Sequence, residues 1–183
     1  MNSDDIIAIL QPMKHNRLAN YIAPGLTSHL IGGEAHGKVR LFSAERDTLE
    51  FITPHSHRFD FVCLVLQGRV RNTIFKRVAG GDELWCLSTI GQVCGVDGLL
   101  GYAHVRATEP SYWYQKTDTY IAGDTYAMSY DEIHSIKFDR GTEVLFFEGP
   151  EITPTSHMLE PWVDGKVVPT FRTSPWMFER EAA

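Results

Sequence analysis

Two histidines, His55 and His57, lie two positions apart in the segment PHSHRFDFVCLVLQGRV, at the entry to an apolar run that is typical of a strand. Side chains of alternate residues in an extended segment project from the same face, so both imidazoles can reach a common point. Imidazole is a common ligand of iron, zinc, nickel and copper, and a site that stays open to a substrate needs about three protein ligands. The pair therefore predicts two ligands of one divalent metal ion.

His134 is the candidate for the third ligand. It ends the run GDTYAMSYDEIHSI, in which a turn signal at residues 129–132 precedes a new apolar strand. In a closed barrel such a strand can pass opposite the first pair of histidines. The remaining histidines have no partner at ligand spacing and are expected to be surface or capping residues, namely His15, His29, His36, His104 and His157.

Other polar side chains near these histidines are second candidates for the site. Asp60 could be a fourth ligand, although strand alternation directs it to the opposite face unless a bulge intervenes. Tyr126 could point inward as a proton donor or an orienting group, and Gln67 and Cys63 share the parity of His55. Cys63 itself is interpreted as a small buried hydrophobic residue.

The elements that would position these residues are strands. After Gly37 the chain consists of short runs rich in Val, Ile, Leu, Phe, Tyr and Thr, separated by Gly, Asp and Asn at intervals of roughly 8–12 residues. This pattern predicts an all-β fold with enough strands to close a double-sheet barrel. The predicted strands are 38–45, 48–53, 59–67, 69–77, 83–89, 102–108, 111–121, 124–128, 134–139 and 142–148.

Three regions follow from this pattern. Residues 1–37 are expected to form a short helical extension. Capping residues and first-turn acids start a helix at residues 3–10, and a second short helix at 14–22 ends before Pro24 and Gly25. Residues 38–149 form the barrel, and the proline- and aromatic-rich residues 150–183 are expected to pack on it. Within the barrel, the glycine-rich segment 90–101 is either a flexible flap or a tight apolar turn.

The composition and charge of the chain limit the classes of partner that we expect. The chain has 183 residues and a net charge of -6, with scattered Lys and Arg, so nucleic acid and anionic membranes are not expected as partners. No run approaches the ~18 apolar residues of a membrane helix. Three cysteines without a paired motif favour a reducing, cytoplasmic compartment. The remaining partner is a small-molecule substrate, and exposed strand edges together with the aromatic tail favour a homodimer.

The first histidine segment resembles the first motif of the cupins, Gly-x5-His-x-His-x3,4-Glu-x6-Gly. His55, His57 and Gly68 match that motif in this sequence. Leu49 stands where the first glycine is expected, and Phe61 occupies the position of the acidic ligand. The usual cupin carboxylate is therefore absent from this motif.

The second histidine segment resembles the second cupin motif, Gly-x5-Pro-x-Gly-x2-His-x3-Asn. Gly123 and His134 match it, whereas Ser129 replaces Pro, Asp131 replaces Gly and Phe138 replaces Asn. The two motifs together imply the double-stranded β-helix of the cupins, a jelly-roll barrel, over roughly residues 37–148. The family also implies one divalent metal ion, with Fe(II) expected and Zn, Ni and Mn as alternatives.

A three-histidine site without the Glu is similar to the thiol dioxygenase branch of the cupins, as is the segment LVLQGRVRNTIF. The resemblance implies an iron(II)-dependent oxygenase that acts on a small metal-chelating substrate. Cysteine itself is not predicted as that substrate. The arginine that binds a substrate carboxylate in this branch falls near Ser28 or His29, and its later Ser-x-His-x-Tyr set falls on Val144, Phe146 and Glu148.

Two alternatives stay open at this point. One is a non-catalytic or regulatory cupin that binds a small ligand in the barrel. The other is a metal-independent sugar epimerase or isomerase, because the same barrel hosts several activities. This second alternative requires a base and an acid poised together, for which His57 and Tyr126 are the candidates.

Overall fold

The computed structural model describes residues 17–21, 23–32, 38–47, 53–94, 100–107 and 109–168. Within these ranges the chain is all-β, as predicted, and contains no helix. The strands are β1 (Arg17–Leu18), β2 (Leu26–Gly32), β3 (Val39–Ala44), β4 (Phe61–Gln67), β5 (Arg69–Val78), β6 (Leu84–Cys94), β7 (Leu100–Arg106), β8 (Ser111–Ile121), β9 (Thr125–Met128), β10 (Ile133–Phe138), β11 (Glu143–Glu148), β12 (Thr155–Val163) and β13 (Lys166–Val167).

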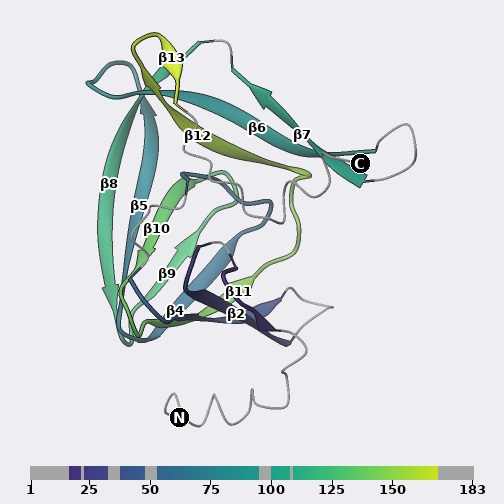
Figure 1. Ribbon diagram of the computed structural model, residues 1–183, viewed down its shortest axis with the longest axis vertical. Coiled ribbons are helices and arrows are strands. Elements are labelled where there is room, and N and C mark those ends of the chain that lie inside the picture. The colour runs from purple at the N-terminus through teal and green to yellow at the C-terminus, as the bar shows by residue number, and fades with distance from the viewer. Residues whose placement is uncertain are drawn as a thin grey trace.

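The strands form two antiparallel sheets that curl into a half-barrel (Figure 1). One sheet has the order β1-β2-β3-β11-β4-β9, and the other has the order β10-β5-β8-β6-β12-β13, with β7 paired to β6. Neighbours in each sheet come from distant parts of the sequence, for example β3 beside β11 and β5 beside β10. This arrangement is consistent with a cupin-like β fold.

The core lies between the two sheets because the inward-facing positions of both are apolar. In β4 the burial alternates along the strand, with Phe61, Cys63 and Val65 buried. They pack with inward residues of the other strands, including Val70 of β5 and Phe146 of β11. Period-two alternation of this kind sends one row of side chains into the core and the other outward.

Two tight turns of the barrel carry glycines with positive φ. Gly68 joins β4 to β5 at φ 78°, and Gly123 precedes β9 at φ 94°. A left-handed backbone favours glycine because a Cβ atom would clash with the following carbonyl. At Gly68 a Cβ would also lie 2.6 Å from Oγ1 of Thr142, so the turn packs closely against the start of β11.

The predicted N-terminal helical extension is not seen in the described residues. Residues 17–18 and 26–32, inside the predicted extension 1–37, form strands β1 and β2 at the edge of the first sheet. Residues 17–18 lie inside the predicted helix 14–22, and their pairing with β2 outweighs the local helical pattern, while Leu26 and Ser28 of β2 are fully buried. The predicted helix at 3–10 lies outside the described residues.

Most predicted barrel strands are present, with shifts at their ends, and β8 spans the predicted residues 111–121. Most of the predicted strand 48–53 lies outside the described residues, and Thr53 is not in a strand. At the two ends of the segment 90–101, residues 90–94 and 100–101 belong to the paired strands β6 and β7. Residues 95–99 lie outside the described part.

The C-terminal region contributes β12, which was not predicted. β12 pairs along most of its length with β6, and Figure 1 shows β6, β7 and β12 running together across one end of the molecule. Pro161 lies opposite Trp85 in this pairing. The other edge of β12 pairs with His55 at Met158 and with β13 from Trp162 onward, so Pro161, which has no N–H to donate, lies between these two pairings. Within the described ranges, no helix has the length and apolar content required to cross a membrane.

Candidate metal centre

The short segment that carries His55 and His57 lies between β10 and β12 of the second sheet and pairs with both. His55 exchanges two backbone hydrogen bonds with His134 of β10, at 2.8 and 2.9 Å, and also bridges to Met158 of β12. The backbone N–H of His57 donates to the carbonyl of Tyr130 at 3.2 Å. The histidines therefore reach one point because backbone pairing sets their positions on neighbouring segments.

The three predicted histidines come together. Their ligand nitrogen atoms all lie within 4.8 Å of one another. The ring centroids of His55 and His57 are 4.9 Å apart, and each lies 5.2 Å from that of His134. His134 is buried, whereas His55 and His57 keep some exposure to solvent.

Two of the imidazoles are oriented by oxygen atoms that can accept a hydrogen bond but cannot donate one. Nδ1 of His134 lies 2.7 Å from Oδ1 of the buried Asn72 side chain, and Nδ1 of His55 lies 2.8 Å from the carbonyl oxygen of Thr53. Each Nδ1 must therefore carry the hydrogen, which leaves Nε2 of both rings with a free lone pair. Such partners orient the ring and fix the tautomer of histidines that bind metals.

The spacing of the Nε2 atoms fits a bound cation. Nε2 of His57 lies 3.0 Å from Nε2 of His134. Because Nε2 of His134 presents a lone pair, either a proton or a metal ion must lie between the two nitrogens. Two nitrogens bound at ~2.1 Å from one ion and at a right angle would be about 3.0 Å apart. The donor set therefore fits a divalent metal ion.

Burial favours the neutral state that metal binding requires. Desolvation lowers the pKa of His55, and the hydrogen bond to Thr53 offsets this only in part. Desolvation holds the pKa of His57 and of His134 well below the usual value, and the charges of the neighbouring histidines lower both pKa values further. Neutral imidazoles with free lone pairs are ready to bind a metal without first losing a proton.

A phenyl ring lies where the cupin motif places its acidic ligand. The Phe61 ring centroid is 4.7 Å from that of His57 and 5.6 Å from that of His134. Phe59 and Phe146 also contact His57, at 5.4 and 6.4 Å. Aromatic rings thus form one wall of the histidine group, and no carboxylate belongs to this group among the described residues.

Asp60 and Tyr126 lie outside the histidine group. The exposed Asp60 accepts a hydrogen bond of 2.8 Å from the backbone N–H of Tyr130. Tyr126 is buried in the core, with its ring stacked on Tyr120 at 4.5 Å and in edge contact with Phe61 at 6.5 Å. Because Phe61 contacts both Tyr126 and His57, this arrangement gives the predicted acid–base pair of an epimerase no support.

The other two candidates on β4, Cys63 and Gln67, differ in burial. Cys63 is buried beside Tyr126, and desolvation raises the pKa of its thiol to about 12, consistent with a structural cysteine. Gln67 is exposed at the end of β4. Asn72 is the residue that the sequence reasoning missed. The available signal was a polar residue on the inward-facing row of β5, between Val70 and Ile74.

Comparisons with known proteins are limited to distant structural similarity. No family model matches the chain, and no curated protein matches it. A hydroquinone 1,2-dioxygenase from Sphingomonas sp. TTNP3, with 4-hydroxybenzoate bound, is 12% identical with a TM-score of 0.40, covering 67% of this chain and 64% of that chain. This chain thus spans less than two thirds of that dioxygenase.

Two other solved structures are similar at the same level. A cupin superfamily protein from Desulfitobacterium hafniense is 12% identical with a TM-score of 0.36, covering 73% of this chain and 76% of that one. Drosophila melanogaster CENP-C bound to CAL1 is 11% identical with a TM-score of 0.40, covering 80% and 95%. All three TM-scores lie below 0.5, so these similarities assign no chemistry to this chain.

Proposed function

We propose that this chain is a cupin-type metalloprotein that binds Fe(II) through His55, His57 and His134 and oxygenates a small metal-chelating substrate. The observation that carries the proposal is the convergence of three imidazoles within 4.8 Å, with two of their free Nε2 lone pairs set by buried or backbone acceptors. A hydrogen bond between Nε2 of His57 and Nε2 of His134 would occupy only one of these lone pairs, whereas a shared metal ion would use all three imidazoles.

The ligand set determines what the site does to its substrate. Three neutral imidazoles leave the double positive charge of the ion uncompensated, which favours an anionic chelator. When bound, ferrous iron would supply redox chemistry and open coordination positions. Asn72 and Thr53 hold the ring planes of His134 and His55, and so limit the geometries open to the ion.

The aromatic side chains around the site indicate the polarity of the substrate beyond its chelating group. Phe59, Phe61 and Phe146 pack against His57, so a chelating group carried on an apolar or aromatic body complements this wall. The partly exposed sides of His55 and His57 give such a molecule access. Thiols, the substrates implied by the resemblance to thiol dioxygenases, and diketones are the two chelator classes that we propose to compare. Tyr126 stays a proposal as an orienting residue, acting through Phe61.

Metal analysis of the full chain, purified without a histidine tag and reconstituted anaerobically with Fe(II), tests the proposal. We expect close to one iron per chain in the wild type and a loss of at least tenfold in affinity in His57→Ala and His134→Ala. His29→Ala is a matched control, because His29 is a partly exposed strand residue whose position on β2 is away from the group. Equal iron content in all four proteins would contradict the proposed ligands.

Oxygen uptake by the iron-loaded protein separates catalysis from ligand binding. A screen of thiols and diketones should show substrate-dependent oxygen consumption that is lost in His134→Ala and kept in His29→Ala. Stoichiometric iron without oxygen uptake for any chelator would favour the regulatory alternative. If the folded wild-type protein binds no metal, the proposed oxygenase activity is ruled out.

A further inference from the structure

A pocket lies on the opposite side of the strand pair that carries the histidines. It has a volume of about 450 Å³, which is in the range of small-molecule sites. Pro54 and Ser135 line it, and each is the direct neighbour of a predicted ligand, His55 or His134. Because successive side chains of extended segments point to opposite faces, the pocket and the histidine group use opposite faces of the same two segments.

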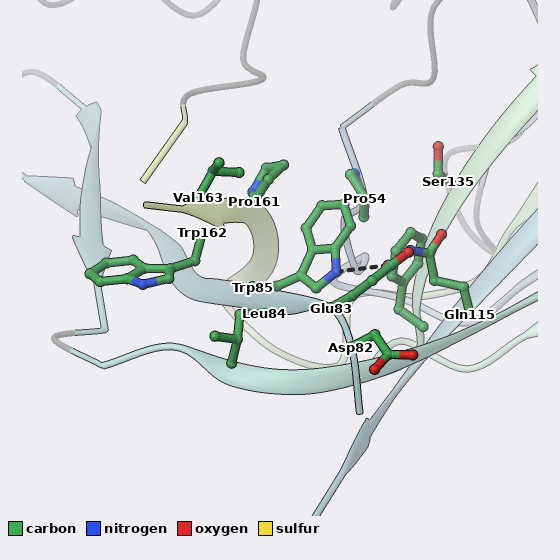
Figure 2. Close-up of a pocket in the computed structure, with 11 residues that line it drawn as sticks. Pro54, Asp82, Glu83, Leu84, Trp85, Gln115, Ser135, Pro161, Trp162 and Val163 are labelled. Carbon is green, nitrogen blue, oxygen red and sulfur yellow. Dashed lines mark hydrogen bonds between the residues drawn. The ribbon is translucent and has the colours of Figure 1, made fainter. Parts of the chain in front are cut away.

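Aromatic rings and carboxylates share this pocket. Figure 2 shows the Trp85 indole standing in the middle of the lining residues, with Glu83 on one side and Trp162 on the other. The Trp85 ring is held by an edge contact with Phe75, at 5.3 Å and 76°. Asp82 completes the acidic side of the pocket.

The charge of this pocket is uncompensated. Its lining includes two acids and no Lys, Arg or His. Of the ion pairs between described residues, none includes Asp82 or Glu83. The Glu83 carboxylate is instead fixed by neutral donors, namely Nε1 of Trp85 at 3.4 Å and the side-chain amide of Gln115.

We propose that this pocket binds a small organic cation, of the quaternary ammonium or alkylamine class. An indole face attracts a cation through its quadrupole, and a nearby carboxylate adds direct charge attraction. An anion would meet two carboxylates here, both of them exposed at the pocket. The site is distinct from the proposed metal centre, whose substrate would bind on the opposite face.

Choline and 3,3-dimethylbutan-1-ol form a suitable probe pair, because the alcohol has nearly the same shape without the charge. Each is titrated into the ¹⁵N-labelled full chain while the indole N–H resonances are followed by NMR. Choline should shift the Trp85 and Trp162 resonances saturably, because both residues line the pocket. The alcohol should bind at least fivefold more weakly.

Substitution of the carboxylates tests the charge. Glu83→Gln keeps the shape of the side chain and should weaken choline binding at least fivefold, and the double variant Asp82→Asn/Glu83→Gln should abolish it. Glu109→Gln is the matched control, because Glu109 is an exposed acid outside the pocket. The proposal is overturned by equal binding of the two probes, by equal choline affinity in wild type and double variant, or by the absence of saturable shifts in folded wild-type protein.

Discussion

Nδ1 of His134 donates its hydrogen to Oδ1 of Asn72 at 2.7 Å, and both side chains are buried, at 3% and 2% exposure. The amide is itself fixed, because its Nδ2 donates to Sδ of Met128 at 3.4 Å. The orientation of a ring on β10 is thus set by a side chain on β5 and, behind it, by a residue on β9. This chain of contacts makes Asn72 a positioning residue of the proposed centre.

Asn72→Leu removes the acceptor at nearly constant volume. We expect metal affinity to fall about 10–100-fold, the usual effect of losing such a partner. Asn72→Asp retains an acceptor and should keep affinity within a few-fold of wild type. Competition titration of Zn²⁺ against a chromophoric chelator measures both variants. Unchanged affinity in Asn72→Leu would show that Asn72 only packs.

Phe61→Glu places a carboxylate where the cupin motif has its acidic ligand. The variant without metal should lose about 3–5 kcal/mol of stability, because a buried ring is removed and a charge is introduced. The metal-bound variant should recover much of this loss, since the new carboxylate can bind the ion. The measured quantity is the rise in Tm on adding Zn²⁺, which should be larger than in wild type. Phe61→Leu, which lacks the donor, should show no such enlarged rise.

The stability of the metal-free protein should depend on pH through the three histidines. Burial lowers the pKa of His55, His57 and His134 in the folded state, whereas the histidines of the unfolded chain are protonated near their usual pKa of 6.5. The unfolded state therefore binds protons first as pH falls. Stability should be complete above pH ~6.5 and fall below it, by at most about 1.4 kcal/mol per pH unit for each histidine.

Urea unfolding with a chelator present, at pH 7.5 and pH 5.5, measures this loss. The double variant His57→Gln/His134→Gln lacks two of the titrating groups and should lose less stability over the same interval. A loss equal to that of wild type would assign the pH dependence to other residues.

Alanine substitutions at two glycines with positive φ distinguish the cost of backbone strain from the cost of steric crowding. Gly123→Ala meets open space and should cost about 1–2 kcal/mol from the left-handed backbone alone. Gly68→Ala carries the same strain, and its Cβ would also lie 2.7 Å from Cα of Thr142, so we expect a cost of about 3 kcal/mol. The free energy of unfolding in urea measures both. Equal costs would show that β11 shifts to make room.

The sequence alone determined the all-β class, most barrel strands and the identity of the three converging histidines. These features are local, because strand alternation and turn glycines such as Gly68 are written in short windows of sequence. The spacing of His55 and His57 likewise implies a shared face before any fold is known.

Only the tertiary structure decided that residues 17–18 and 26–32 form strands, that Asn72 orients His134, and that Tyr126 lies behind Phe61. Each depends on a partner far away in the sequence, β3 for β2 and β10 for β5. Such pairing and burial energies outweigh local propensity. The acidic aromatic pocket has the same origin, since Trp85 and Pro161 lie opposite each other only when β6 and β12 have paired.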